Sequence, residues 1–384
     1  MTLDYEFLAP PRIVFGWGRR RELAALARTL GQRAFVVLGS RTLQANGAWD
    51  ELAGQLHHAG IDVVLSATIT REPEVPDVDQ LVATLQQHGA GSGDFLLAIG
   101  GGAAIDLAKA SAALATNRHG SSVRDFLEGV GKGLQVTEPP LPMLAMPTTG
   151  GTGTEATKNA VISLYDPAVK KSIRSPLMVP RLVLVDPELC VSVPSATTAW
   201  TGMDAITQCI ESYICRFAKP IPQALALDGL RHALPMIRIA VRDGANRAAR
   251  EAMSHAALLS GLALANSGLG FAHGVAAAIG AFAKVPHGLA CAMMLPVALT
   301  VNREVAREAL AELGRRTLNV SGDAFIDHIA QMCADLNVPT KLSQVGVLPS
   351  QLDDLVQGSR GNSMNGNQRQ LTDVELRAIL EERL

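Results

Sequence analysis

Short apolar runs alternate with amphipathic segments along the first half of the chain. The apolar runs have the length and β-branched character of buried strands, and strands are expected at 34–38, 61–65, 95–99, 141–146 and 182–185. The segments between them predict helices at 48–59, 80–88 and 103–115. Strands that alternate with helices are typical of parallel βαβ units with helices on both faces of a sheet. The first half is therefore expected to form an α/β domain.

The pattern changes after about residue 190, where strand-like runs become rare. Segments rich in alanine and leucine follow, and helices are expected within 196–217, 222–240, 246–281, 289–317 and 321–336. The chain is therefore expected to divide into an α/β domain at 1–189 and an all-helical domain at 190–384. The stretch 358–370 is polar and rich in glycine and asparagine, which predicts a surface loop before a last helix at 372–383.

The composition supports two folded domains and argues against several classes of partner. The 384 residues are 48% apolar and 18% charged, so the chain can bury a large core. The formal net charge of −2 gives no overall basic field, which makes nucleic acid and anionic membrane poor partners. The segment 1–16 does not resemble a secretion signal, and no apolar run reaches the roughly 20 residues that a bilayer requires.

The cysteines give a first indication of the cellular compartment. There are five of them, an odd number, and no two are spaced as Cys-x-x-Cys. This argues against a disulfide framework and against a thiolate zinc site. A reducing, cytoplasmic environment is expected.

A glycine-rich turn follows the strand expected at 95–99. Gly100, Gly101 and Gly102 lead directly into the next helix. Glycine lets the backbone approach a ligand closely, and a helix start supplies unpaired N–H donors that suit a pyrophosphate. A tight strand-to-helix turn without a ligand is the alternative. Asp106 is a further candidate for cofactor contact, with a surface ion pair to Lys109 as its alternative.

A second loop of glycine and threonine follows the strand expected at 141–146. Its sequence, MPTTGGTGTEAT, places hydroxyl groups beside exposed backbone, and the candidate cofactor contacts here are Thr148, Thr149 and Thr152. Two such loops at the carboxyl ends of parallel strands are where a dinucleotide is expected to bind.

A candidate metal site lies in the helical half. Asp204 and Gln208 are spaced i,i+4, so both side chains leave the same face of one helix. His273 and His287 follow, and Pro286 predicts that His287 enters from a turn or a helix start. One carboxylate, one amide oxygen and two imidazoles make a plausible site for a divalent metal. The alternative is that these histidines are packed within the core, and the remaining ones are expected at the surface or in packing roles: His57, His58, His88, His119, His232, His255 and His328.

The motifs together resemble the iron-containing, group III alcohol dehydrogenases. They occur in the expected order as Phe15-Gly16, GGGAAIDLAK, PTTGGTGTE, LVDPEL, GMDAITQCIE, AHGVAAAIG and PHGLACAMMLP. The resemblance implies a Rossmann-like domain that binds NAD(P), followed by an all-helical domain that holds a divalent metal, Fe or Zn, as in the dehydroquinate synthase-like architecture. It also implies an active site between the two domains and a homodimer.

The resemblance assigns roles to individual residues. The implied cofactor contacts are Gly100, Gly101, Gly102, Thr148, Thr149, Asn159 and Lys170. The implied metal ligands are Asp204, Gln208, His273 and His287, and the catalytic role falls on Asp204 and the two histidines.

Three positions depart from the family pattern. Many members have histidine where this chain has Gln208, and an amide oxygen is usually a weaker donor for Fe or Zn. Some relatives have a histidine near the nicotinamide where this chain has Ala277, so a proton relay through that position is not available. NAD-preferring relatives often have aspartate at Ser40; its absence, together with the neighbouring Arg41, makes NADP acceptable.

The expected reaction is reversible hydride transfer between the nicotinamide and a small aldehyde or primary alcohol, with the metal as Lewis acid. Maleylacetate reductase is an alternative, but Asp204 argues against it because those enzymes resemble a pattern with asparagine there. The metal motifs of a dehydroquinate synthase-type lyase are not visible. Gln208 and Ala277 keep open a cofactor-binding but catalytically silent homologue.

Overall fold

A parallel sheet of six strands organises the first half of the computed structural model, which describes residues 4–166 and 168–384. The strand order is β1-β8-β5-β4-β2-β3, and every pair of neighbours is parallel. The strands are β1 (Ile13–Phe15), β2 (Arg33–Leu38), β3 (Asp62–Thr68), β4 (Asp94–Gly100), β5 (Met143–Pro147) and β8 (Leu182–Val185). The carboxyl ends of β2, β4 and β5 therefore lie along one edge of the sheet.

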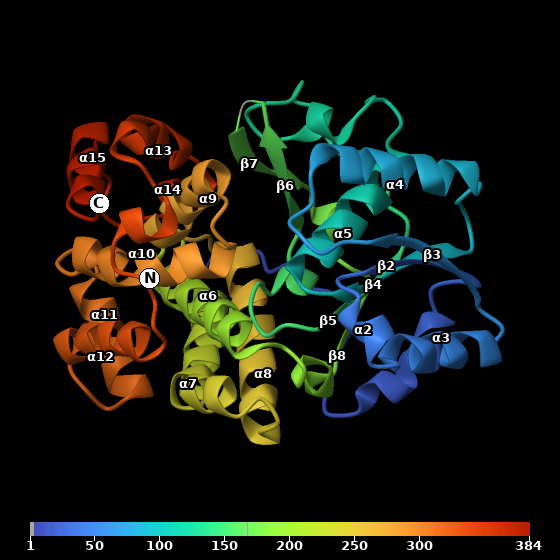
Figure 1. The fold of residues 1–384 in the computed structure, drawn as a ribbon, viewed down its shortest axis with the longest axis horizontal. Coiled ribbons are helices and arrows are strands. Elements are labelled where there is room, and N and C mark those ends of the chain that lie inside the picture. The colour runs from blue at the N-terminus through green and yellow to red at the C-terminus, as the bar shows by residue number, and fades with distance from the viewer. Residues whose placement is uncertain (1–3, 167) are drawn as a thin grey trace.

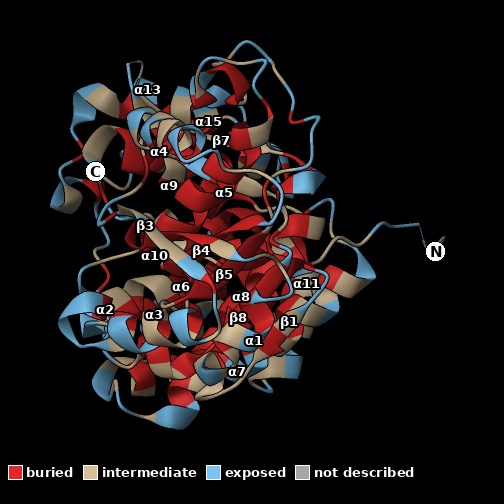
Figure 2. Ribbon diagram, turned by 90° about the vertical axis from the view of Figure 1, so that its right-hand side faces the viewer, coloured by how far each residue is buried: buried red, intermediate tan, exposed pale blue. Residues whose placement is uncertain are grey.

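Helices cover both faces of this sheet (Figure 1). In β2, Val36 packs with the helices of one face, whereas Phe35 and Val37 pack with those of the other, because successive side chains of a strand point to opposite sides. Figure 2 shows the result: the inner strands β4 and β5 are buried, the edge strand β3 is only partly buried, and the outer surfaces of the helices are exposed. The helices of this half are α1 (Leu23–Ala27), α2 (Thr42–Ala45), α3 (Ala48–His58), α4 (Val75–Gln87) and α5 (Gly102–Thr116).

The predicted strands and helices of this half are confirmed, with differences at their ends, whereas the short helices α1 and α2 were not predicted. Helix α4 begins before the predicted start at residue 80, because Glu74 and Asp77 form a capping box and Pro76 fits the first turn. Strand β1 and an antiparallel hairpin were not predicted. The hairpin consists of β6 (Asn159–Tyr165) and β7 (Ala168–Arg174).

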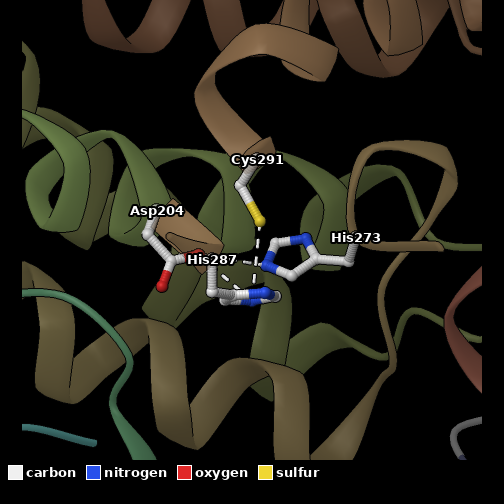
Figure 3. Close-up of side chains that lie close together, drawn as sticks. All are labelled: Asp204, His273, His287 and Cys291. Atoms are coloured by element: carbon white, nitrogen blue, oxygen red, sulfur yellow. Dashed lines mark hydrogen bonds and ion pairs between the residues drawn. The ribbon is translucent and has the colours of Figure 1, made fainter. Parts of the chain in front are cut away.

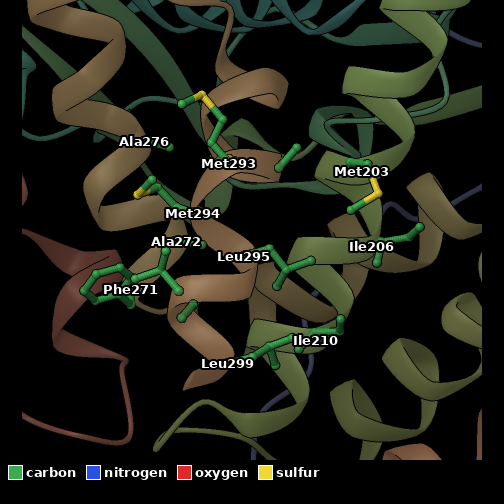
Figure 4. Close-up of a cluster of buried hydrophobic side chains, with 14 of the residues drawn as sticks. Met203, Ile206, Ile210, Phe271, Ala272, Ala276, Met293, Met294, Leu295 and Leu299 are labelled. Carbon is green, nitrogen blue, oxygen red and sulfur yellow. The ribbon is translucent and has the colours of Figure 1, made fainter. Parts of the chain in front are cut away.

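The second half is helical, as predicted. A large core joins its helices, and Figure 4 shows Ile206 and Ile210 packed with Phe271, Leu295 and Leu299. The helices are α6 (Ser195–Ile214), α7 (Pro220–Arg242), α8 (Arg247–Asn266), α9 (Phe271–Ala283), α10 (His287–Asn302), α11 (Arg307–Thr317), α12 (Gly322–Asp335), α13 (Leu352–Gly358), α14 (Asn362–Asn365) and α15 (Asp373–Glu381).

Two of the predicted helical segments are broken. The segment 246–281 contains α8 and α9, which meet at a bend of 100°. The segment 289–317 contains α10 and α11. Within the described ranges no single helix is both long and apolar enough to cross a membrane, although α8 and α9 pass that test as a bent pair.

The prediction of a surface loop at 358–370 is right only in part: several residues of this stretch are exposed, but others are not. Ser359 and Asn367 are buried, and the short helix α14 lies within this stretch. The side-chain Oδ1 of Asn367 accepts hydrogen bonds from the backbone N–H of Phe271 (3.1 Å) and from Nδ2 of Asn302 (2.8 Å). Asn367 therefore satisfies the start of α9 and the end of α10, whereas other polar residues of this stretch, such as Asn362 and Asn365, are exposed.

Candidate active site

Three helices of the second half bring the predicted metal ligands together. Asp204 comes from α6, His273 from α9 and His287 from α10 (Figure 3). The distance from Asp204 Oδ1 to His273 Nε2 is 3.2 Å, and to His287 Nε2 it is 3.9 Å. Cys291 joins this cluster: one donor atom from each of the four side chains lies within 4.8 Å of all the others. A carboxylate, two imidazoles and a thiol at this spacing fit a divalent metal.

The start of α10 explains the position of His287. Pro286 is the N-cap residue, so α10 begins at His287, as predicted. Gly288 then lets α10 approach α6 closely, because a Cβ at this position would lie only 2.5 Å from the carbonyl oxygen of Trp200. Cys291 follows one helical turn after His287, and its Sγ lies 3.5 Å from Nε2 of that histidine.

Glu211 holds His273 in position and was not predicted. It lies seven residues after Asp204 on the same face of α6, and its Oε2 is 2.6 Å from Nδ1 of His273. Its Oε1 accepts a hydrogen bond from the backbone N–H of Ala272 at 2.6 Å, so Glu211 also supplies the cap that α9 lacks from its own residues. With Nδ1 bound to a carboxylate, Nε2 of His273 is directed to the cluster, as is usual for metal-binding imidazoles.

The cluster is buried and strongly polarised. The exposed fractions are 1% for Asp204 and 4% for His273, while the side chain of His287 keeps 34%. Burial would lower the pKa of His273, but Cys291 and the carboxylates of Asp204 and Glu211 raise it well above its ordinary value. The pKa of His287 rises to about 9, because Cys291 and Asp204 outweigh burial. Burial would raise the pKa of Asp204, but the two imidazoles lower it. A cation therefore displaces protons when it binds here.

The structure gives Gln208 a hydrogen-bond partner on another helix. It is buried one turn after Asp204, but its side-chain Oε1 accepts a hydrogen bond of 2.6 Å from the hydroxyl of Ser260 on α8. Ligation of a metal by Gln208 stays a prediction. Cys291 lies in the cluster although the chain has no Cys-x-x-Cys pair, and the sequence argument against a thiolate zinc site stays a prediction. The spacing of His287 and Cys291 by four residues was the available signal.

The glycine turn after β4 has the properties of an anion site. Helix α5 begins at Gly102, and its N-cap residue Gly101 supplies no side-chain cap, so the first N–H groups of the helix have no such partner. The ends of β2 and β4 approach closely here: a Cβ on Gly100 would lie 2.5 Å from Cα of Gly39. The turn therefore leaves backbone, rather than side chains, to meet a bound phosphate.

Asp106 and Lys109 are buried, so the alternative of a surface ion pair was wrong. Asp106 accepts hydrogen bonds from the hydroxyl of Thr154 and, at 3.0 Å, from the backbone N–H of Val161. The ammonium group of Lys109 donates to the carbonyl oxygens of Thr154 (2.6 Å) and Asn159 (2.7 Å). Both residues anchor the loop that follows β5 to helix α5, and a contact from Asp106 to the cofactor stays a prediction.

The other predicted cofactor residues lie at or near the same edge of the sheet. Ser40 and the exposed Arg41 follow β2. The backbone N–H of Thr148, after β5, donates to the carbonyl oxygen of Gly100 at 3.0 Å. Thr149 and Thr152 lie against the glycine turn itself, beside Gly101 and Gly102 respectively.

Asn159 and Lys170 lie on the hairpin that reaches toward the second domain. The side-chain Oδ1 of Asn159 is buried without a hydrogen-bond partner in the described part of the chain, which fits a contact to a bound group. Lys170 is paired with Glu72 and lies against Gly280 of α9. The hairpin therefore joins the candidate cofactor site to the helix that carries His273.

The loop 147–157 connects the two halves of the candidate site directly. Gly151 lies against Thr201 of α6, one helical turn before Asp204, and Gly150 lies against Met253 of α8. The candidate nucleotide and metal sites are thus two sides of one structural unit.

Comparison with known proteins assigns the chain to a family. The family described as iron-containing alcohol dehydrogenase matches residues 10–187, and the C-terminal part of that family matches residues 198–384. The protein belongs to the iron-containing alcohol dehydrogenase family, which confirms the resemblance seen in its motifs. It is an oxidoreductase that acts on CH–OH groups.

Individual relatives and structures agree with this assignment. A probable alcohol dehydrogenase of Escherichia coli (strain K12) is 34% identical over 88% of this chain and 84% of its own length. A choline dehydrogenase of Bacillus subtilis (strain 168) is 32% identical over 97% of this chain and 93% of its own length. The crystal structure of a 1,3-propanediol oxidoreductase superposes with a TM-score of 0.90 at 28% identity, covering 99% of this chain and 100% of that one. A sulfoacetaldehyde reductase of Bifidobacterium kashiwanohense, solved in complex with NAD+, superposes with a TM-score of 0.88 at 28% identity, covering 100% of this chain and 99% of that one. The predicted fold class is thereby confirmed.

Proposed function

We propose that the protein is an NAD(P)-dependent, metal-dependent alcohol dehydrogenase that interconverts a small aldehyde and its primary alcohol. The observation that carries this proposal is the buried cluster of Asp204, His273, His287 and Cys291, which lies beside the loop that contacts the glycine turn of β4. A metal site and a nucleotide site in contact are what hydride transfer to a polarised carbonyl requires.

Different residues of this chain serve cofactor binding, metal binding and positioning. The uncapped start of α5 binds the pyrophosphate, and the loop 147–157 sets the distance between nucleotide and metal cluster. Asp204, His273 and His287 would hold the divalent metal, which would supply a Lewis acid for the carbonyl or alkoxide oxygen. Glu211 keeps the ring of His273 oriented toward the cluster. The partly exposed side chain of His287 marks the side from which the substrate arrives.

The alternatives have little support in these residues. Asp204 is at the centre of the cluster, which argues against the maleylacetate reductase pattern. A silent homologue would have no reason to keep four donor groups together in a buried site. A homodimer and a cytoplasmic location stay predictions.

Cofactor oxidation across a panel of small aldehydes tests the proposal, with NADH and NADPH and with Zn²⁺ or Fe²⁺ supplied to metal-depleted protein. We expect turnover that depends on added metal and falls at least about a hundredfold in His273→Ala, the scale on which loss of a key active-site interaction acts. The variant should still bind NADH. Bound cofactor without turnover on any aldehyde, at full metal occupancy, would favour the silent homologue.

A further inference from the structure

We infer that the thiolate of Cys291 is the fourth metal ligand in this protein, in place of Gln208, and that the resulting site selects zinc. The inference rests on the proposed function, because it concerns the metal site of that reaction. It assigns the role of a ligand to a residue that the predicted ligand set does not include, although this residue lies within the motif PHGLACAMMLP.

Geometry favours Cys291. It lies on α10 one turn after His287, is completely buried, and directs its Sγ toward the two imidazoles (Figure 3). Its Sγ lies within 4.8 Å of the donor atoms of Asp204, His273 and His287. The first turn of α10 therefore supplies two ligands from one rigid helical face.

The surroundings of Gln208 point the same way. Its amide oxygen accepts a hydrogen bond of 2.6 Å from the hydroxyl of Ser260 on α8. This bond uses one of the two lone pairs of the amide oxygen and fixes the side chain of Gln208 to α8. Gln208 is thus already used to connect α6 with α8.

Charge and softness decide between the two ligands. A thiolate and the carboxylate of Asp204 together balance a divalent cation, whereas an amide oxygen leaves one positive charge uncompensated in a buried site. Thiolate with imidazole is the ligand combination that zinc prefers, while a neutral oxygen donor binds it more weakly. On binding, the S–H bond of Cys291 breaks, the Sγ–metal bond forms, and one proton is released to solvent with no change of oxidation state.

Cobalt(II) is the probe, because thiolate coordination gives it an intense charge-transfer band in the near ultraviolet that nitrogen and oxygen ligands do not give. We expect metal-depleted wild-type protein to develop this band with one equivalent of Co²⁺ at the site. Cys291→Ser should lose the band and bind Zn²⁺ at least about tenfold more weakly, in competition with a chelating indicator, since even outer-sphere losses cost this much. Gln208→Leu should keep the band.

Two controls isolate the site. Cys333→Ser removes another buried cysteine of the helical domain and should keep the band. His232→Ala disrupts the other cluster of metal-binding side chains in the described ranges, formed by Asp228, His232 and His255, and should also leave the band unchanged. NADH binding by each variant shows that it is folded.

The possible results separate this inference from the function on which it rests. A wild-type protein that binds cobalt and turns over aldehydes without a charge-transfer band, or a band that persists in Cys291→Ser, overturns the assignment of Cys291 and leaves the proposed function standing. A protein that shows the band but oxidises no cofactor with any aldehyde supports the ligand and contradicts the function.

Discussion

At the residue scale, side chains that hydrogen-bond to the predicted metal ligands determine how those ligands are oriented. Glu211 touches no predicted substrate or cofactor group, yet it binds Nδ1 of His273 and the backbone at the start of α9. It is therefore a positioning residue that acts through His273.

Glu211→Gln keeps an oxygen for the N–H of Ala272 but removes the charge opposite His273. We expect the affinity for Zn²⁺ to fall about ten- to a hundredfold, because the imidazole becomes a poorer and less ordered ligand. Glu251→Gln, at a partly exposed position of α8 where the glutamate pairs with Arg247, is the matched control. A variant with unchanged metal affinity and a lowered melting temperature would show that Glu211 only stabilises α9.

The turn after β2 is expected to affect the choice between NADH and NADPH. Ser40 and Arg41 follow the strand end where the adenosine ribose of a bound dinucleotide is expected, and Arg41 is exposed. Ser40→Asp should raise the KM for NADPH on the order of tenfold, because its carboxylate repels the 2′-phosphate, and should not raise the KM for NADH. An unchanged ratio of the two KM values would mean that the ribose lies elsewhere.

The sequence predicted those members of the cluster that stand in recognisable motifs. Asp204, His273 and His287 stand in recognisable settings, and Pro286 correctly indicated a helix start. Glu211 was missed because its role depends on how α6 and α9 pack together, which its position on one helix does not indicate. Cys291 was missed although it follows His287 by four residues, because only the search for Cys-x-x-Cys pairs was applied to the cysteines.

At the scale of secondary structure elements, helix α5 and the loop 147–157 form one buried polar unit. Glu155, in the 3-10 turn Thr154–Ala156, is 2% exposed, and burial raises its pKa to about 7. Lys109 lowers this pKa and Asp106 raises it, but burial dominates.

This raised pKa predicts a pH-dependent stability. Since the pKa in the folded state lies above the ordinary value of 4.5, the folded protein binds the extra proton, and the stabilisation is complete below pH 4.5 and lost as pH rises through 7. Its size is on the order of 3 kcal/mol. Urea unfolding at pH 5 and pH 7.5 should show Glu155→Gln losing less stability over this interval than the wild type. Parallel curves for the two proteins would contradict the assigned pKa.

Elements were predictable where local pattern and tertiary environment agree. The buried strands of the sheet are apolar runs in the sequence, and both ends of β8 agree with the prediction. The hairpin of β6 and β7 was missed because much of β7 is only partly buried and rich in charge, so it lacks an apolar run. The bend between α8 and α9 was missed because apolar residues continue on both sides of it, although Gly268 and Gly270 lie within it.

At the scale of the whole molecule, the two domains meet through segments that also form the candidate site. The loop 147–157 packs on α6 and α8, and the hairpin places Lys170 against α9. The segment 358–370, predicted to be a surface loop, closes the start of α9 through Asn367. Composition alone could not show this, because polar residues serve equally well in a solvated loop and in a buried hydrogen-bond network.

The central claim is that this unit transfers a hydride with the help of a metal at Asp204, His273 and His287. The most direct test is deuterium transfer from NADH deuterated at the transferable position of the nicotinamide ring to a small aldehyde, comparing zinc-loaded wild type, metal-depleted wild type and Asp204→Asn. For the zinc-loaded protein we predict that deuterium appears on the hydroxyl-bearing carbon of the alcohol that is formed. Metal-depleted wild type and Asp204→Asn should transfer deuterium at least about a hundredfold more slowly and should still bind NADH. Transfer at an equal rate without metal, or in Asp204→Asn, would contradict the account.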